Sequence, residues 1–322
     1  MHRQEQRARW DLVDVLRGVA ILAMIVYHFS WDLSFLRLIQ TDITIEPGWQ
    51  WFARGIAGSF LVLVGIGLAL AHEGRFNRAA FLRRLAKVAG AALAVTLVTF
   101  LAFPESYIFF GILHCITVSS ILALPFLRAP VWLALAAAAA SIVLPFVLIG
   151  PQWDHPWLDW LGLGVREPVT NDYVPIMPWF GVVLIGVAVG KLMLRSRWRE
   201  DLARWRVTGP TGRVLTWAGR QSLPIYLIHQ PILLGALFGL SQVIGLQTSP
   251  GMPAFRAECE ATCLQANGNA GLCRTACDCV VGRLKENGVW ERVLADRVSP
   301  SDQANITEAA KICLRQSPPP AP

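Results

Sequence analysis

The sequence predicts an all-α polytopic membrane helix bundle of about seven spans, followed by a small disulfide-rich helical hairpin module. Three observations support this prediction. Of the 322 residues, 54% are hydrophobic and only 16% are charged, whereas soluble domains average about 25% charged residues. The hydrophobic residues come in runs of roughly 20, the length of helix that crosses a bilayer. Six of the seven cysteines lie in a polar C-terminal region, where they predict a second, disulfide-linked module.

The runs that predict spans lie at 13–36, 50–71, 86–103, 107–127, 131–149, 175–194 and 221–246. The first run follows an arginine-rich start, as a signal peptide would. Against that interpretation, Asp11, Asp14 and Arg17 interrupt the approach, and no small-x-small cleavage site follows. We therefore expect an uncleaved first span.

Basic residues predict the orientation of the spans. Lys and Arg gather before span 1 and between spans 2 and 3, 4 and 5, and 6 and 7, while the alternate loops hold little beyond Arg37, Arg54 and Arg166. By the positive-inside rule the N-terminus is cytoplasmic and the C-terminus lies outside, as in a bacterial cytoplasmic (inner) membrane. The net charge of +7 belongs to the membrane part, because residues 250–322 hold equal numbers of acidic and basic side chains. This charge indicates attraction to anionic membrane lipids and no nucleic-acid partner.

The composition divides the chain into four parts. Residues 1–246 form the expected transmembrane domain and 247–253 a turn-rich linker. Residues 254–316 form an extracytoplasmic cysteine-rich module, and 317–322 a disordered tail rich in proline.

The cysteine spacing predicts how this module is linked. Two C-x3-C motifs each place two cysteines on one helix face, and Asn267-Gly268-Asn269 forms a turn between the helices. A hairpin with nested disulfides fits this spacing, although other pairings are open. The predicted pairs are Cys259–Cys277, Cys263–Cys273 and Cys279–Cys313. Metal binding is the weaker alternative, because the module has no histidine and extracytoplasmic thiols usually oxidise. Cys115, inside a span, is expected to be a buried packing thiol.

Two titratable residues in the first span are the main candidates for chemistry. His28 and Asp32 lie one helical turn apart, and a charged group in hydrocarbon costs about 2.5–3.5 kcal/mol on insertion scales. Asp32 can hold one ring nitrogen of His28 and so orient it as a general base. The alternative is that the pair is interhelical glue without a chemical role.

Two further histidines lie within predicted spans. By helical rise, His114 and His28 could share a depth, and Gly111 would let another helix approach His114 closely. His114 is therefore a third catalytic candidate, as a ligand of the acceptor or of the oxyanion. His229 lies between Pro224 and Pro231, which free backbone carbonyls. It either lines a cavity or merely satisfies one of those carbonyls. No third ligand accompanies these histidines, so no metal site is expected.

The remaining candidates lie near the membrane surfaces. Arg17, Arg220 and the Arg83-Arg84 pair lie at the cytoplasmic mouth, where they either anchor the topology or hold the phosphates of a nucleotide-bearing ligand. Several tryptophans lie near the outer boundary, where they form an aromatic belt or stack on sugars.

Four motifs resemble the heparan-alpha-glucosaminide N-acetyltransferase catalytic-domain family. Arg9-Trp-Asp11-x2-Asp14-x2-Arg17 leads into His28-Phe-Ser-Trp31-Asp32, and further matches begin at Gly58, Phe110 and Gly219. The resemblance covers roughly residues 9–246, and the His-x2-Trp-Asp pattern is its most specific part. The cysteine-rich region matches no part of this family.

The resemblance implies an acyl-CoA donor, such as acetyl-CoA, reached from the cytoplasm and a saccharide acceptor met on the far side. The catalytic histidine of the family falls on His28. The donor site is assigned to Arg17, Arg220, Ser222 and His229, and the saccharide site to Trp31 and Trp179. The acyltransferase-type-3 group begins similarly, so an amine and a hydroxyl acceptor both stay open.

Two other classes of function compete with this hypothesis. A proton-coupled transporter would also place titratable residues and a broken helix near the midplane, but the chain shows no internal repeat. A plain anchor for the cysteine-rich module would leave His28, Asp32 and His114 unexplained.

Overall fold

The computed structural model describes residues 10–243, 251–294 and 298–316, except positions 37, 40, 42, 45, 74, 75, 105 and 268. These residues form helices and connecting segments without any β-strand, which confirms the all-α class. The chain divides into two compact units, residues 1–31 with 43–233 and residues 32–42 with 234–322. The predicted tail and most of the predicted linker lie outside the described residues, and the helix after the linker already begins at Gly251.

Six helices of the described chain are long and apolar enough to cross a membrane. Each coincides with a predicted span, and together they confirm a polytopic helix bundle. They are α1 (Asp11–Phe35), α2 (Pro47–Ala71), α3 (Arg78–Ala102), α6 (Val131–Leu148), α7 (Ile176–Arg195) and α10 (Ser222–Val243). Two further helices, α8 (Arg199–Arg204) and α9 (Pro210–Arg220), and two single 3-10 turns, η1 (Pro151–Trp153) and η2 (Asp159–Leu161), lie between spans.

The fourth predicted span, at 107–127, is not one continuous helix. α4 runs only from Ile112 to Leu122, and α5 follows from Leu124 to Arg128. Before α4, hydroxyl groups of α3 satisfy the backbone of Ile108: Thr96 Oγ1 donates to its carbonyl oxygen at 2.7 Å, and its N–H donates to Thr99 Oγ1 at 3.0 Å. These bonds replace the ones that a helix would make at this point.

α5 ends against a lysine of α7. The side chain of Lys191 is buried, and its Nζ donates to the carbonyl oxygens of Phe126, at 3.0 Å, and Ala129. A cation at a helix C-terminus stabilises the carbonyls left without partners there. Lys191 therefore has a local role in addition to its contribution to the predicted charge bias.

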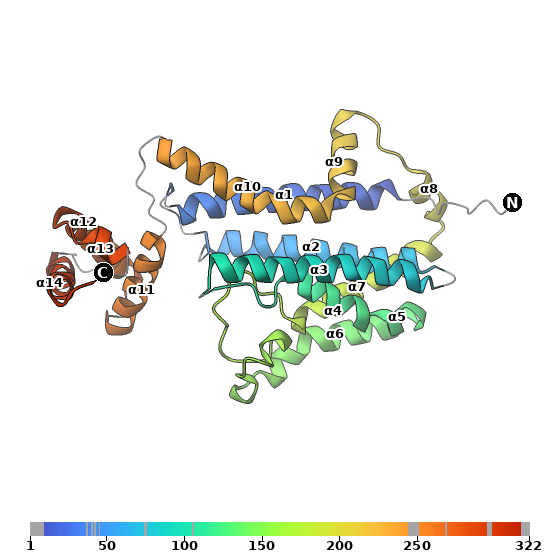
Figure 1. Ribbon diagram of the computed structural model, residues 1–322. Helices are drawn as coiled ribbons and strands as arrows, with labels where there is room; N and C mark the ends of the chain where they lie inside the picture. Colours follow the sequence, from blue (N-terminus) through green and yellow to red (C-terminus); the bar gives the residue numbers. More distant parts are fainter. Residues whose placement is uncertain are drawn as a thin grey trace. The chain divides into compact units, whose positions relative to one another are not determined.

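Glycines bring α7 close to α2. A β-carbon at Gly65 would overlap the carbonyl oxygen of Val183, and one at Gly186 would overlap that of Val62. Because α7 also packs along α6, it is the central helix of the first unit. Figure 1 shows α1 and α10 beside each other on one side of α2 and α7, with α4, α5 and α6 on the other.

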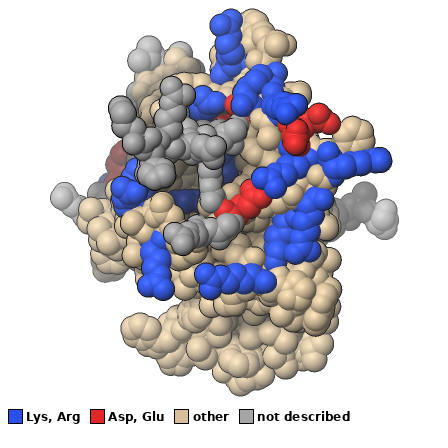
Figure 2. Space-filling view, turned by 90° about the vertical axis from the view of Figure 1, so that its right-hand side faces the viewer, with Lys and Arg blue, Asp and Glu red and all other residues tan. Residues whose placement is uncertain are grey.

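The outward faces of the bundle are apolar, and its charges gather at one end. On α3 and α6 large side chains such as Leu101 and Phe146 are more than four-fifths exposed, as contact with lipid tails allows. Figure 2 shows Lys and Arg side chains concentrated on the end of the first unit where α8 lies. By the positive-inside rule, this end is predicted to face the cytoplasm.

The second unit contains the predicted helical hairpin. It consists of α11 (Gly251–Asn267) and α12 (Ala270–Glu286), and α13 (Trp290–Leu294) and α14 (Pro300–Gln316) follow. The disulfides Cys259–Cys277, Cys263–Cys273 and Cys279–Cys313 are all present, with Cα–Cα distances of 6.0, 5.5 and 5.7 Å. The predicted pairing is therefore confirmed, and Cys115 is the buried free thiol expected.

Candidate active site

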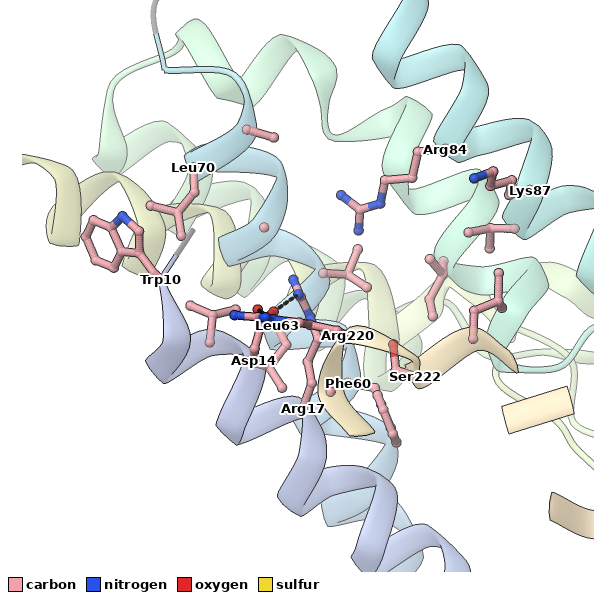
Figure 3. Close-up of a pocket in the computed structure, with 18 of the residues that line it drawn as sticks. Trp10, Asp14, Arg17, Phe60, Leu63, Leu70, Arg84, Lys87, Arg220 and Ser222 are labelled. Atoms are coloured by element: carbon pink, nitrogen blue, oxygen red, sulfur yellow. Dashed lines mark hydrogen bonds and ion pairs between the residues drawn. The ribbon is translucent and has the colours of Figure 1, made fainter. Parts of the chain in front are cut away.

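A cavity of about 830 Å³ opens at the basic end of the first unit. Helices α1, α2, α3, α4, α8, α9 and α10 all contribute to its wall. Three of the four residues assigned to a donor site lie on it, namely Arg17, Arg220 and Ser222. Figure 3 shows these side chains with Asp14, Arg84 and Lys87 around the cavity.

Ion pairs hold two of the cavity arginines in place. Arg17 Nη1 lies 3.1 Å from Asp14 Oδ1, and Arg220 Nε lies 3.1 Å from Asp14 Oδ2. Arg220 also pairs with Asp11 at 3.1 Å. Gly219 allows this arrangement, since a β-carbon there would overlap the backbone of Asp14. The sequence analysis named both arginines as candidates. It did not predict that they share the carboxylate of Asp14, because that contact depends on the packing of α9 on α1.

Helix α3 adds two cations that have no such partner. Arg84 and Lys87 line the cavity, and within the described part of the chain neither makes an ion pair or a side-chain hydrogen bond. Gly67 leaves space for the guanidinium groups, because a β-carbon there would lie 2.9 Å from Arg17 Nη2 and 3.8 Å from Arg84 Nη1. Arg84 is half-buried, and a buried cation requires a counter-charge. The cavity is therefore suited to an anion.

Two histidines from different helices meet deeper in the bundle. The ring centroids of His28, on α1, and His229, on α10, lie 4.9 Å apart. His229 Nδ1 lies 2.7 Å from the carbonyl oxygen of Tyr226 and 3.2 Å from that of Ile225. Carbonyls only accept hydrogen bonds, so Nδ1 carries the proton. Pro231 would free the carbonyl of Leu227, four residues earlier, so His229 does not simply satisfy the group that this proline releases.

The cavity approaches this histidine pair at Tyr226. The side chain of Tyr226 lines the cavity, and its ring centroid lies 5.9 Å from that of His229, one turn later on α10. Phe60 and Ile112 flank Tyr226 on the cavity wall. Neither His28 nor His229 lines the cavity, and Tyr226 is the cavity residue whose ring contacts that of His229.

His114 lies elsewhere and has both ring nitrogens engaged. The N–H of Gly111 donates to Nδ1 at 3.2 Å, so the proton of the neutral ring is on Nε2. Nε2 lies 3.2 Å from Thr96 Oγ1, whose own proton goes to the carbonyl oxygen of Ile108. The geometry shows a histidine that caps the start of α4. Its catalytic role stays a prediction.

The loop before α7 supplies a carboxylate that the sequence analysis missed. Asp172 Oδ2 accepts the N–H of Ile112 at 2.9 Å, and it leaves no space for a side chain at position 111. Burial raises the pKa of Asp172 to about 6, although the hydrogen bond from Ile112 acts in the opposite direction. No sequence pattern distinguishes this residue, because its partner lies 60 positions away.

The comparison with protein families identifies the membrane part of the chain. Residues 9–231 match the family described as heparan-alpha-glucosaminide N-acetyltransferase, catalytic. The chain belongs to this family. Its membership indicates a membrane acetyltransferase that acts on saccharides and favours the enzyme over the transporter. No match was found among curated proteins or among solved structures.

The N-acetyltransferase match includes both the cavity and the histidine pair. Cavity residues run from Trp10 to Tyr226, and the match ends two residues after His229. The disulfide-linked helices lie beyond it. No group of three potential metal ligands occurs among the described residues.

The other predicted site residues of this acetyltransferase lie away from the cavity. Asp32 is fully buried near the end of α1. Within the described part of the chain, the imidazole of His28 takes part in no hydrogen bond, so orientation by Asp32 stays a prediction. Trp31 and Trp179 are half-buried and do not line the cavity. Their assignment to the acceptor also stays a prediction.

Proposed function

We propose that this chain transfers an acetyl group from acetyl-CoA, bound in the arginine-lined cavity, to an amine or hydroxyl of a saccharide. The donor enters from the cytoplasm and the acceptor from the opposite side of the membrane. The observation that carries the proposal is the pair of cations on α3, Arg84 and Lys87, which line the cavity and make no ion pair within the described chain, whereas Asp14 in the same wall is already paired with Arg17 and Arg220.

The chemistry of acetyl-CoA fits the two ends of the cavity. Its diphosphate and ribose phosphate are anions that guanidinium groups bind through paired hydrogen bonds. Arg17 and Arg220 are already held by carboxylates, so Arg84 and Lys87 supply the uncompensated charge. The volume of about 830 Å³ falls within the range of roughly 300–1,000 Å³ that ligand sites occupy.

The inner end of the cavity directs the thioester toward the histidines. Phe60, Ile112 and Tyr226 give this end an apolar wall, which suits an acyl group rather than a phosphate. In this proposal His28 deprotonates the acceptor or carries the acetyl group itself. Asp32 orients His28, His114 assists at the acceptor, and Trp31 with Trp179 contacts the sugar.

Proteoliposomes test the proposed reaction. Vesicles are loaded with methyl β-D-glucosaminide, which offers both an amine and hydroxyls, and labelled acetyl-CoA is added outside. Acetylated sugar inside the vesicles would support the proposal. Uptake or release of the sugar without consumption of acetyl-CoA would overturn it in favour of transport.

A matched pair of variants tests the cavity as the donor site. Arg84→Gln removes an unpaired cavity cation, whereas Arg83→Gln removes its exposed neighbour, which does not line the cavity. Loss of one charge-assisted hydrogen bond should raise the KM for acetyl-CoA about tenfold to a hundredfold in Arg84→Gln. Arg83→Gln should stay close to the parent. Equal KM values in the two variants would place the donor elsewhere.

A further inference from the structure

The histidine on α10 has the features of a general base. His229 Nδ1 is fixed as the protonated nitrogen by the carbonyls of Tyr226 and Ile225. In the neutral ring Nε2 therefore carries a lone pair. This atom is buried and, among the described residues, has no hydrogen-bond partner.

Neither of the other two histidines within the predicted spans, His28 and His114, offers a nitrogen prepared in this way. Both ring nitrogens of His114 are engaged by Gly111 and Thr96. The imidazole of His28 makes no hydrogen bond within the described chain, so no neighbour there fixes its tautomer. A base with a fixed tautomer needs no reorganisation before it accepts a proton.

The position of His229 fits the proposed path of the donor. Its ring lies 4.9 Å from that of His28 and 5.9 Å from that of Tyr226, measured between centroids. Tyr226 lines the inner end of the cavity, so a thioester that passes this residue reaches both imidazoles. Two imidazolium charges so close together would repel each other. The pair therefore suits a reaction in which one ring holds a proton and the other stays neutral.

We propose that His229 is the general base of the acetyl transfer and that His28 is its neutral partner beside the reacting carbonyl. The inference rests on the proposed function and changes one assignment in it: His229, rather than His28, takes the proton from the acceptor. His229 Nε2 removes the proton from the acceptor amine or hydroxyl as its nitrogen or oxygen bonds to the thioester carbon. The carbon–sulfur bond breaks, and the imidazolium returns the proton to the CoA sulfur. The products are the acetylated saccharide and CoA with a free thiol.

The variant His229→Asn isolates this role. An asparagine amide can still donate to the carbonyl of Tyr226, but it cannot accept a proton. We expect kcat for acetyl transfer to methyl β-D-glucosaminide to fall about 10²–10⁴-fold, the usual contribution of a general base. The KM for acetyl-CoA should change less than twofold. The rise of kcat/KM with pH that reports deprotonation of the base should disappear.

The outcomes distinguish this inference from the proposed function. Parent protein that transfers no acetyl group from acetyl-CoA would overturn the proposed function and the inference with it. Active parent protein with His229→Asn within tenfold of its kcat, or with the pH dependence retained, would overturn the inference alone. His229→Gln replaces His229→Asn if the latter fails to fold, with the same two criteria. His28→Asn is the control: it should slow transfer but keep the pH dependence that His229 causes.

Discussion

Asp172 combines a stabilising contact with an unfavourable burial. Its carboxylate caps the N-terminus of α4 through Ile112, and burial raises its pKa to about 6, compared with about 4 in an unfolded chain. At a pH between these two values, the carboxyl group of Asp172 is protonated in the folded protein and ionised in the unfolded chain. Stability therefore falls as the pH rises through this interval, and the loss is complete above the pKa of the folded state.

The variant Asp172→Asn tests this pH dependence. Asparagine keeps an oxygen that can accept the N–H of Ile112 but carries no charge. In thermal unfolding from pH 4 to 8, we expect the variant to have the higher Tm above pH 6 and the difference to close toward pH 4. Glu167→Gln, at an exposed site in the same loop, should follow the parent at every pH. A difference that grows toward pH 4 would contradict the assignment.

Asp14 is the residue on which the two anchored arginines depend. It is only 4% exposed and contacts both Arg17 and Arg220. Asp14→Asn should lower the free energy of unfolding by about 1–3 kcal/mol, the cost of weakened charge-assisted hydrogen bonds, and should raise the KM for acetyl-CoA. Asp11→Asn is the control, since Asp11 supports Arg220 but not Arg17. Denaturant titration and donor KM values measure both effects, and equal effects in the two variants would contradict the central position of Asp14.

At the scale of the helices, small residues determine which pairs pack most closely. A β-carbon at Gly65 on α2 would overlap the backbone of α7, whereas one at Gly90 on α3 would meet nothing within 4 Å. Gly65→Ala should therefore lower stability by about 1–3 kcal/mol through overpacking. Gly90→Ala should raise it by roughly 0.5–1 kcal/mol, because alanine is the better helix former. Thermal unfolding in detergent measures both, and a neutral Gly65→Ala would show that α2 and α7 can separate without cost.

Hydropathy predicted the six long helices correctly but wrongly predicted one continuous helix over residues 107–127. The difference has a physical reason. An apolar run of sufficient length forms a helix in lipid because its backbone groups have no other partners. Residues 107–111 do have other partners, since Thr96, Thr99 and Thr170 bond the backbone of Tyr107 and Ile108. Those partners are distant in sequence, so a window of hydropathy does not detect them.

At the scale of the whole molecule, features that depend on residues close together in the sequence could be predicted. Features that depend on the packing of distant segments could not. The two disulfides between α11 and α12 could be predicted because each C-x3-C motif places its two cysteines on one helix face, and Cys279 and Cys313 were then left as the third pair. The cavity arginines could be proposed because cations near span ends are conspicuous. The contact of His28 with His229 and the capping by Asp172 could not, because each depends on how distant segments pack.

The number of times the chain crosses the membrane determines on which side of it the three disulfides lie. Six long helices alone would return the chain to the side of its N-terminus, which the charge bias predicts to be the reducing cytoplasm, where disulfides are rare. α4 and α5 together cover residues 112–128, about 25 Å if helical throughout. A crossing by this pair would place the three disulfides outside. We therefore expect α4 and α5 to act jointly as the seventh crossing.

Protease sites at the two ends of the chain test this topology. One site is inserted before Trp10 and the other after Gln316, and a protease that cannot cross membranes is added to spheroplasts, whose outer membrane has been opened. The C-terminal site should be cut in spheroplasts, because an odd number of crossings carries it outside the cytoplasm. The N-terminal site, as the internal control, should be cut only after the spheroplasts are permeabilised. Protection of both sites in intact spheroplasts would mean an even number of crossings, and α4 with α5 would then have to enter and leave the membrane on one side.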